Sequence, residues 1–235
     1  MGFKEELQSA VDEVVKSSLD VIDGRAMPDE KNIPLGSGAT RVPVAILYAD
    51  LAASTAMVKN LKPEVAAVVI RAFLKCAARC ITYRGGAIKS FDGDRVMGVF
   101  YGGSKELDAA RCALDIAFAV SNIVRPALRK RWQTIEQYYK LDHAAGVDTS
   151  NVLVVRGGPR GDNDLVWVGS APNVAARLSE VRHATYKSFI TNAVFGALGK
   201  DLKKDNKGNP VWYKHSDRRF PSLGDFCASS YFTSF

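Results

Sequence analysis

Residues 42–49, VPVAILYA, are almost entirely apolar and rich in β-favouring side chains, and Asp50 ends the run. An unbroken apolar run of this length is typical of a central strand that is buried on both faces of a sheet. The sequence therefore predicts a central strand at 42–49 with a carboxylate at its end.

A long helix and a hairpin are predicted after this strand. The helix covers 63–83, because proline suits a first turn and the following apolar residues recur at helical spacing. Two short strands, 87–91 and 95–101, follow, and Asp92-Gly93 is a dipeptide that favours a two-residue turn between them. This arrangement places Asp94 beside the tip of the hairpin.

A second long helix is predicted over 105–128, and residues 143–155 then predict two more strands around a turn at 148–151. Strand, helix, hairpin, helix, strand is the ferredoxin-like βαββαβ order. The expected fold class is α/β of the α+β kind, a mixed and mostly antiparallel sheet with helices packed on it.

The N-terminal 41 residues are predicted to lie outside this core. Residues 3–22 have the apolar spacing of an amphipathic helix, and residues 24–41, with two prolines and several glycines, read as an irregular connection. Residues 42–235 are expected to form one domain, because a chain of 235 residues can bury one sizeable core.

Composition restricts the location and the partners. The N-terminus has acidic residues where a signal peptide has basic ones, and the longest apolar run is interrupted by Asp50, so no membrane association is expected. Four cysteines without zinc-site spacing indicate reduced thiols and a cytoplasmic protein. A net charge of +7 without a basic stripe interleaved with aromatics favours an anionic small molecule over nucleic acid.

Asp50 and Asp94 are expected to meet at one rim of the sheet, because the first strand and the hairpin are neighbours in the ferredoxin-like topology. Beside them, Ala53, Ser54 and Thr55 form a loop of small residues whose backbone amides could bind phosphate. Such a rim could hold Mg²⁺ or Mn²⁺ with triphosphate oxygens. The alternative is a strand-end cap and a turn residue without a metal.

Asn173 and Arg177 lie four residues apart in a predicted helix that begins near Pro172. An amide and a guanidinium on one helix face suit a developing charge on a ribose or an α-phosphate. A solvated polar face is the alternative interpretation.

Four motifs together resemble, in order and spacing, the catalytic domain of the class III nucleotidyl cyclases, and the resemblance covers residues 42–200. They are 44-VAILYADLAASTAMV-58, 93-GDRVMGVF-100, 145-AGVDTSNVLV-154 and 169-GSAPNVAARL-178. The resemblance implies that Asp50, Asp94 and the Leu51 carbonyl bind two Mn²⁺ or Mg²⁺ ions, and that Asn173 and Arg177 act on the transition state. It also implies a homodimer whose active sites are shared between protomers.

The positions that read the base depart from the purine enzymes of this family. Adenylate cyclases have lysine and aspartate, and guanylate cyclases glutamate and cysteine, where this chain has Ser90 and Val166. The chain is instead similar to the Pycsar pyrimidine cyclases of bacterial anti-phage defence. Tyr48, on the same strand face as Asp50, could narrow the pocket for a smaller base. Lys89 is one residue out of position, and a β-bulge could bring it back.

The resemblance implies that UTP, or alternatively CTP, is converted to the 3′,5′-cyclic nucleotide and pyrophosphate by two-metal in-line attack. The product would be a second messenger for anti-phage defence, acting on an effector that responds to cyclic nucleotides. Two alternatives stay open: an adenylate cyclase with rerouted base recognition, for instance through Lys89, and a nucleotide-binding sensor without turnover.

Overall fold

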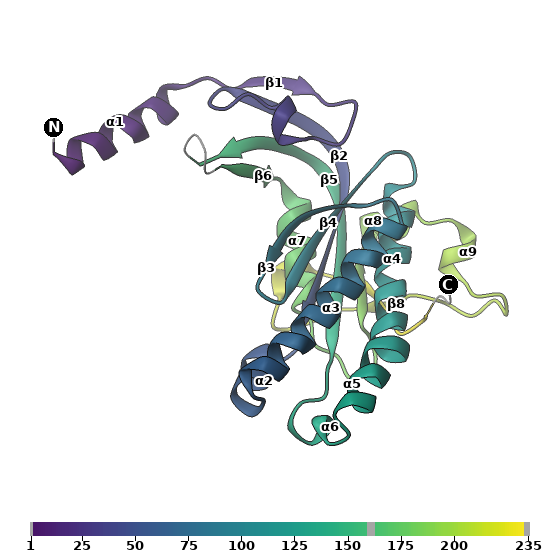
Figure 1. Cartoon of the computed structure of the whole chain (residues 1–235). Coiled ribbons are helices and arrows are strands. Elements are labelled where there is room, and N and C mark those ends of the chain that lie inside the picture. Colours follow the sequence, from purple (N-terminus) through teal and green to yellow (C-terminus); the bar gives the residue numbers. More distant parts are fainter. Residues whose placement is uncertain (1, 159–162, 233–235) are drawn as a thin grey trace. The chain divides into compact units, whose positions relative to one another are not determined.

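The computed structural model describes residues 2–158 and 163–232 (Figure 1). The chain forms two compact units, one of Met1–Pro43 with Asn151–Gly169 and a larger one of Val44–Ser150 with Ser170–Phe235. The division expected from the sequence, 1–41 and 42–235, stays a prediction. No helix in the described ranges is long and apolar enough to cross a membrane.

The smaller unit holds the N-terminal elements and a strand pair. Its elements are α1 (Phe3–Lys16), β1 (Asp20–Asp23), η1 (Glu30–Asn32), the start of β2 (Gly38–Leu51), the end of β5 (His143–Gly157) and β6 (Asp164–Val168).

The larger unit holds the rest of β2 and β5 and the other elements. These are α2 (Ser54–Asn60), α3 (Pro63–Tyr83), β3 (Ala87–Asp92), β4 (Arg95–Tyr101), α4 (Lys105–Ala119), η2 (Val120–Val124), α5 (Arg125–Arg131), α6 (Ile135–Tyr138), α7 (Ser170–Ser179), β7 (Ser188–Thr191), α8 (Asn192–Ala197), α9 (Lys200–Lys203), β8 (Tyr213–His215), η3 (Pro221–Leu223) and β9 (Phe226–Ser229).

The sheet has the predicted ferredoxin-like core. The strand order is β3-β4-β2-β5-β7-β9-β8, so the hairpin β3–β4 lies beside β2, and β2 lies beside β5. The pairs β2–β4, β3–β4, β7–β9 and β8–β9 are antiparallel, and β5–β7 is parallel. The prediction of a mixed, mostly antiparallel sheet is confirmed.

Helices cover the sheet on both faces. α3 and α4 pack against each other and against β4 (Figure 1), and their buried side chains join Leu47 and Phe100 in the main core. α7 packs on β7, and its Leu178 joins Phe189 in a second cluster. Phe189 and its neighbour Ile190 belong to different clusters, as expected when successive strand residues face opposite ways.

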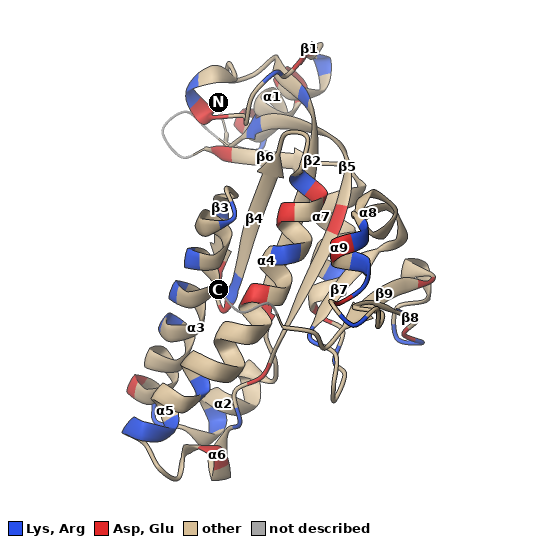
Figure 2. Ribbon diagram, turned by 90° about the vertical axis from the view of Figure 1, so that its right-hand side faces the viewer, with Lys and Arg blue, Asp and Glu red and all other residues tan. Residues whose placement is uncertain are grey.

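The exposed side of α3 is basic. Arg71, Lys75 and Arg79 are exposed at four-residue spacing, and Figure 2 shows basic residues along this helix. Phe73 and Ala77, on the opposite side, are fully buried. This division of polar and apolar side chains explains why the periodicity predicts the helix correctly.

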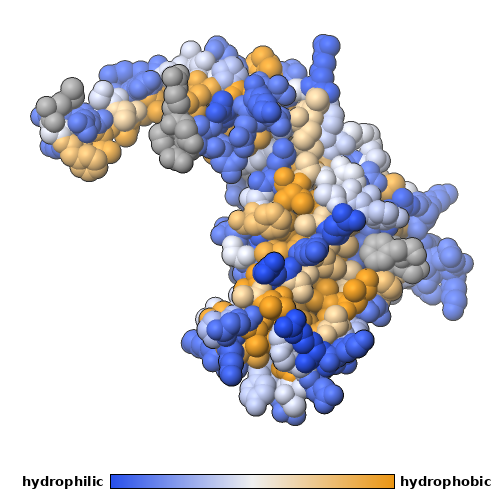
Figure 3. Space-filling view, viewed as in Figure 1, coloured by the Kyte–Doolittle hydropathy of each residue, from blue (hydrophilic) through white to orange (hydrophobic). Residues whose placement is uncertain are grey.

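The prediction of a helix over 3–22 and an irregular segment over 24–41 is wrong in part. The helix ends at Lys16, and β1 pairs in parallel with residues 38–41 of β2. Val21 and Ile22 favour extended backbone, and a parallel partner that lies some 18 residues further along the chain leaves no local turn signal. The apolar residues of α1 are exposed, and Figure 3 shows them as orange side chains on this helix.

The prediction of two strands around a turn at 148–151 is also wrong, because β5 is one strand from His143 to Gly157. The Asp148 carboxylate accepts a hydrogen bond of 2.7 Å from Thr191 Oγ1, and Thr149 Oγ1 donates to the Val44 carbonyl at 3.1 Å. These tertiary bonds satisfy the polar side chains that otherwise favour a turn. β6 pairs antiparallel with residues 153–157.

A buried ion pair ties the end of α3 to α4. Arg84 Nε and Nη2 donate to the two carboxylate oxygens of Asp115 at 2.5 and 3.0 Å, and the Asp115 side chain is fully buried. We expect Asp115→Ala to lower the free energy of unfolding by about 3–5 kcal/mol, because it leaves the half-buried Arg84 guanidinium without this carboxylate partner. Urea unfolding at a fixed protein concentration measures this change.

The matched control is Asp201→Ala, which removes the 2.7 Å ion pair with Arg111 at a carboxylate that is 63% exposed. A loss below about 1 kcal/mol is expected there. Equal losses in the two variants would contradict the assigned role of the buried pair.

Candidate active site

The predicted base-binding residues Tyr48 and Ser90 lie in one row across three strands. Tyr48 on β2 is opposite Met97 on β4, and Met97 is opposite Ser90 on β3. Residues that are directly opposite point to the same face, so Tyr48 and Ser90 flank Met97. The Tyr48 hydroxyl donates to Met97 Sδ at 3.2 Å, and the guanidinium of Arg95 lies 5.3 Å from the centre of the Tyr48 ring.

A β-bulge in β3 sets the register of Ser90 against β4. Ile88 is opposite Gly98 and Ser90 is opposite Met97, so the ladder skips Lys89. A bulge of this kind inserts one extra residue into one strand and locally bends that strand. The structure therefore contains the bulge on which the Lys89 alternative depends, while Ser90 stays in the row that contains Tyr48.

The two predicted metal aspartates lie at the same end of these strands. Asp50 is opposite Arg95, and Arg95 is opposite Asp92, so the two-residue loop of the hairpin is Gly93-Asp94 rather than Asp92-Gly93. Gly93 has φ +60°, a conformation that glycine adopts without strain. Asp92 is the last strand residue, and its carboxylate pairs with Arg95 at 3.0 Å.

Asp94 carries an unsatisfied carboxylate oxygen. Asp94 Oδ2 is buried and has no hydrogen-bond partner within the part of the chain that the structure describes. Its negative charge acts on Asp50, whose pKa it helps to raise. A buried oxygen that lacks a donor is costly unless a cation or a donor reaches it, so this pair of carboxylates fits a divalent ion.

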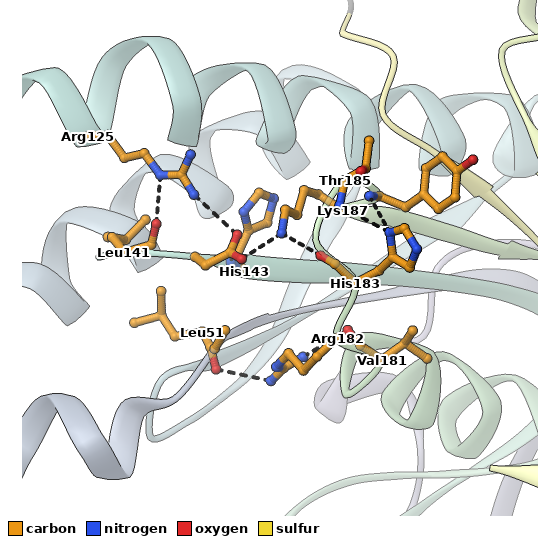
Figure 4. A network of polar contacts seen from close by, with 12 residues as sticks. Leu51, Arg125, Leu141, His143, Val181, Arg182, His183, Thr185 and Lys187 are labelled. Atoms are coloured by element: carbon orange, nitrogen blue, oxygen red, sulfur yellow. Dashed lines mark hydrogen bonds and ion pairs between the residues drawn. The ribbon is translucent and has the colours of Figure 1, made fainter. Parts of the chain in front are cut away.

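Arg182, which the sequence did not single out, contacts two predicted metal ligands. Its Nη2 lies 2.6 Å from Asp50 Oδ2 and 3.2 Å from the Leu51 carbonyl oxygen. Figure 4 shows the side chain extending to the Leu51 carbonyl. Burial raises the pKa of the Asp50 carboxyl, and the hydrogen bond and charge of Arg182 act in the opposite direction.

The residues that follow Leu51 line two pockets. Ser54 and Thr55 line a pocket of about 480 Å³ with Asp94. Ala53, in the left-handed conformation at φ +56°, lines a second pocket of about 440 Å³ with Arg182. The sequence predicts a loop at 53–55, but Ser54 and Thr55 form the first turn of α2 and only Ala53 precedes the helix. Ser54 and Thr55 lie beside Asp94, and Ala53 lies beside Arg182.

The second pocket, which we call the basic pocket, is predominantly cationic. Its lining residues are Ala52, Ala53, Lys140, Asp142, His143, Arg182, His183, Ala184 and Lys187. Lys187 Nζ is 2.6 Å from the Asp142 carboxylate (Figure 4), and Arg125 Nη2 is 3.3 Å from it. Burial lowers the pKa of His143 to about 3, so this imidazole is neutral and the cations outnumber the one carboxylate.

Asn173 and Arg177 lie on one side of α7, as their four-residue spacing predicts, and both are exposed. Arg177 Nη1 donates to Ser222 Oγ at 2.6 Å, so in the single protomer it is directed to η3. Glu180, one turn further on, lies 3.6 Å from Arg95 Nη1. Val166 lies on β6 in the smaller unit, opposite Val155, and is 44% exposed.

Sequence reasoning missed Arg95 as well as Arg182. Arg95 stands at the start of an apolar strand in 93-GDRVMGVF-100. A charged residue in that position is a signal that could have identified it. No comparable signal marks Arg182, which is one of several cations that follow α7.

Solved structures of similar fold are nucleotide cyclases. The guanylyl cyclase Cya2 gives a TM-score of 0.65 at 21% identity over 83% of this chain and 94% of that chain. The adenylyl cyclase CyaB from P. aeruginosa gives 0.64 at 18% identity over 84% and 97%. A bacterial light-regulated adenylyl cyclase gives 0.68 at 21% identity over 83% and 53%. The fold is that of the class III nucleotidyl cyclases.

Sequence comparison narrows the family. No protein-family model matches the chain. A uridylate cyclase of Rhodovulum sp. (strain MB263) is 36% identical over 229 residues, 97% of this chain and 92% of the relative. A uridylate cyclase of Burkholderia cepacia is 41% identical over 214 residues, 90% and 91%. The chain belongs to the uridylate cyclase family.

Proposed function

We propose that the chain converts UTP to 3′,5′-cyclic UMP and pyrophosphate, with CTP as the alternative pyrimidine substrate. Its membership of the uridylate cyclase family supports the pyrimidine nucleotide cyclase activity. The observation that supports this location of the site is the buried Asp94 Oδ2, which has no partner within the described chain and belongs to the hairpin tip beside the Asp50 end of β2.

The proposed metal ligands are Asp50, Asp94 and the Leu51 carbonyl. Two Mn²⁺ or Mg²⁺ ions bound there would make the ribose 3′-hydroxyl more acidic and neutralise the departing pyrophosphate. The chain itself supplies oxygen ligands, which these hard cations prefer. In this proposal the backbone amides of Ala53, Ser54 and Thr55 donate hydrogen bonds to the phosphate chain of the substrate.

The proposed role of Arg177 is to stabilise the charge that develops on the α-phosphate, and that of Asn173 is to orient the ribose. Both side chains are exposed on α7, where a second protomer could reach them. We propose a homodimer in which one protomer supplies the metal ligands and the other supplies Asn173 and Arg177. Such an isologous dimer has two equivalent sites.

The row of Tyr48 and Ser90 is the proposed base-binding surface. The role of Val166, the third position named from the resemblance, stays a prediction. A phenol ring held by Met97 and Arg95 occupies space beside Asp50, and neither Ser90 nor Val166 carries the charged side chain of a purine reader. A pyrimidine is the smaller ring and suits a narrowed site.

Tyr48→Ala is expected to lower the preference for UTP over ATP on the order of tenfold or more. The variant removes the ring that narrows the proposed base pocket, so the larger purine is excluded less strongly. The measurement is kcat/KM for each of the four nucleoside triphosphates. Tyr83→Ala, at a tyrosine that is 67% exposed, is the matched control and should keep the wild-type order. An unchanged preference in Tyr48→Ala would remove this side chain from base selection.

The test of the function is incubation of the purified chain with Mn²⁺ and each of UTP, CTP, ATP and GTP, followed by mass spectrometry of the products. Cyclic UMP as the main product supports the proposal. Cyclic AMP would favour the route through the Lys89 bulge, and binding without any cyclic product would indicate a sensor.

The wider role is proposed on the resemblance and the family. A cyclic pyrimidine nucleotide made after phage infection would act on an effector that responds to cyclic nucleotides. The four cysteines are unpaired, in keeping with the proposed cytoplasmic location. We propose that the chain binds neither a membrane nor a nucleic acid.

A further inference from the structure

The guanidinium of Arg182 contacts two of the proposed metal ligands directly. A single nitrogen, Nη2, approaches both the Asp50 carboxylate and the Leu51 carbonyl. The other terminal nitrogen, Nη1, donates to the carbonyls of Ser179 and Val181 at 2.6 and 3.3 Å. One side chain therefore connects the end of α7 to the ends of β2.

This contact is a strong one for a guanidinium. The side chains of Arg182 and Asp50 are 31% and 16% exposed, so solvent screens the pair only in part. A charge-assisted hydrogen bond of 2.6 Å is at the short end of its class. The same two oxygens cannot serve Arg182 and a divalent ion equally well, because two cations that share a carboxylate repel each other.

The basic pocket provides a second position for Arg182. Arg182 lines it together with Lys140 and Lys187, and Lys187 is already neutralised by Asp142 at 2.6 Å. A polyphosphate in this pocket would provide the counter-charge that Arg182 loses when it leaves Asp50. Guanidinium groups bind phosphate oxygens in bidentate fashion.

We propose that Arg182 is an exchangeable cation of the active site: it holds Asp50 and Leu51 when no ion is bound, gives way to the incoming divalent ion, and then binds the phosphate chain in the basic pocket. This inference rests on the proposed metal site, and it adds a substrate-binding residue that connects metal loading to phosphate binding. It makes metal and polyphosphate bind cooperatively through one side chain.

The experiment uses the full chain, Mn²⁺ and inorganic triphosphate. With Mn²⁺ alone, the electron paramagnetic resonance signal of free Mn²⁺ gives the affinity, and Arg182→Gln is expected to bind Mn²⁺ on the order of tenfold tighter than the wild type. With Mn²⁺ present, calorimetry should show inorganic triphosphate binding on the order of tenfold weaker in Arg182→Gln. Neither measurement depends on which nucleotide is the substrate, so the failure of this inference is distinct from the failure of the proposed function.

Three variants make the result decisive. Arg182→Lys keeps the charge and should stay near the wild type for Mn²⁺, which separates charge from folding. Arg71→Gln, on the exposed side of α3, should change neither affinity. Asp50→Asn combined with Arg182→Gln should lose the gain in Mn²⁺ affinity. Unchanged or weaker Mn²⁺ binding in Arg182→Gln, unchanged triphosphate binding, or a gain that persists without Asp50 would each overturn the proposal.

Discussion

Asp94→Asn is expected to lower kcat for cyclic-nucleotide formation by roughly three orders of magnitude or more, while the chain stays folded. The carboxylate oxygen that it neutralises is buried and has no partner in the described part of the chain, so no hydrogen bond within these ranges depends on it. A buried oxygen that costs stability and forms no hydrogen bond within the described ranges is more easily explained by a ligand than by the fold.

The measurement is product formation from UTP with saturating Mn²⁺, beside a thermal unfolding curve. Asp92→Asn is the matched control, since Asp92 lies two residues away and its side chain is 77% exposed in a surface pair with Arg95. We expect its kcat to stay within about twofold, because such pairs contribute little. If Asp94→Asn kept more than about a tenth of the wild-type kcat, Asp94 could not be a ligand on which the reaction depends.

The core of the fold could be predicted because its signals are local. The apolar run at 42–49, the amphipathic spacing of 63–83 and the glycine at the hairpin tip each report a strand, a helix or a turn within a few residues. β1 and the long β5 were missed for the opposite reason. β1 is stabilised by residues 38–41, and Asp148 is held in extended backbone by Thr191, 43 residues away.

The same distinction holds for the candidate site. Topology alone brought Asp50 and Asp94 to one rim, since it fixes which strands are neighbours. It could not identify Arg182, which reaches Asp50 across 132 residues of sequence. Side-chain direction in the segment between α7 and β7 depends on packing rather than on a pattern, so only the structure shows that contact.

Mixing two inactive variants is expected to restore activity if the sites are shared between protomers. Asp94→Asn damages the metal side and Arg177→Ala the α7 side, so each homodimer has two defective sites. A mixed dimer has one site with both defects and one with none. With random assembly from equal amounts, half of the dimers are mixed, and about a quarter of the wild-type activity should return.

The control is the pair Asp50→Asn and Asp94→Asn, both on the metal side, whose mixed dimers contain no intact site and should stay inactive. Co-expression with two different affinity tags allows the mixed dimer to be purified and its turnover to be measured directly. Recovery in the first pair but not in the second requires metal ligands and Arg177 to act from different protomers. Arg177 donates to Ser222 Oγ at 2.6 Å on its own protomer, and both Asn173 and Arg177 are exposed on α7, so a second chain can contact these side chains. Failure of both mixtures to recover activity would instead place Arg177 in the site of its own protomer.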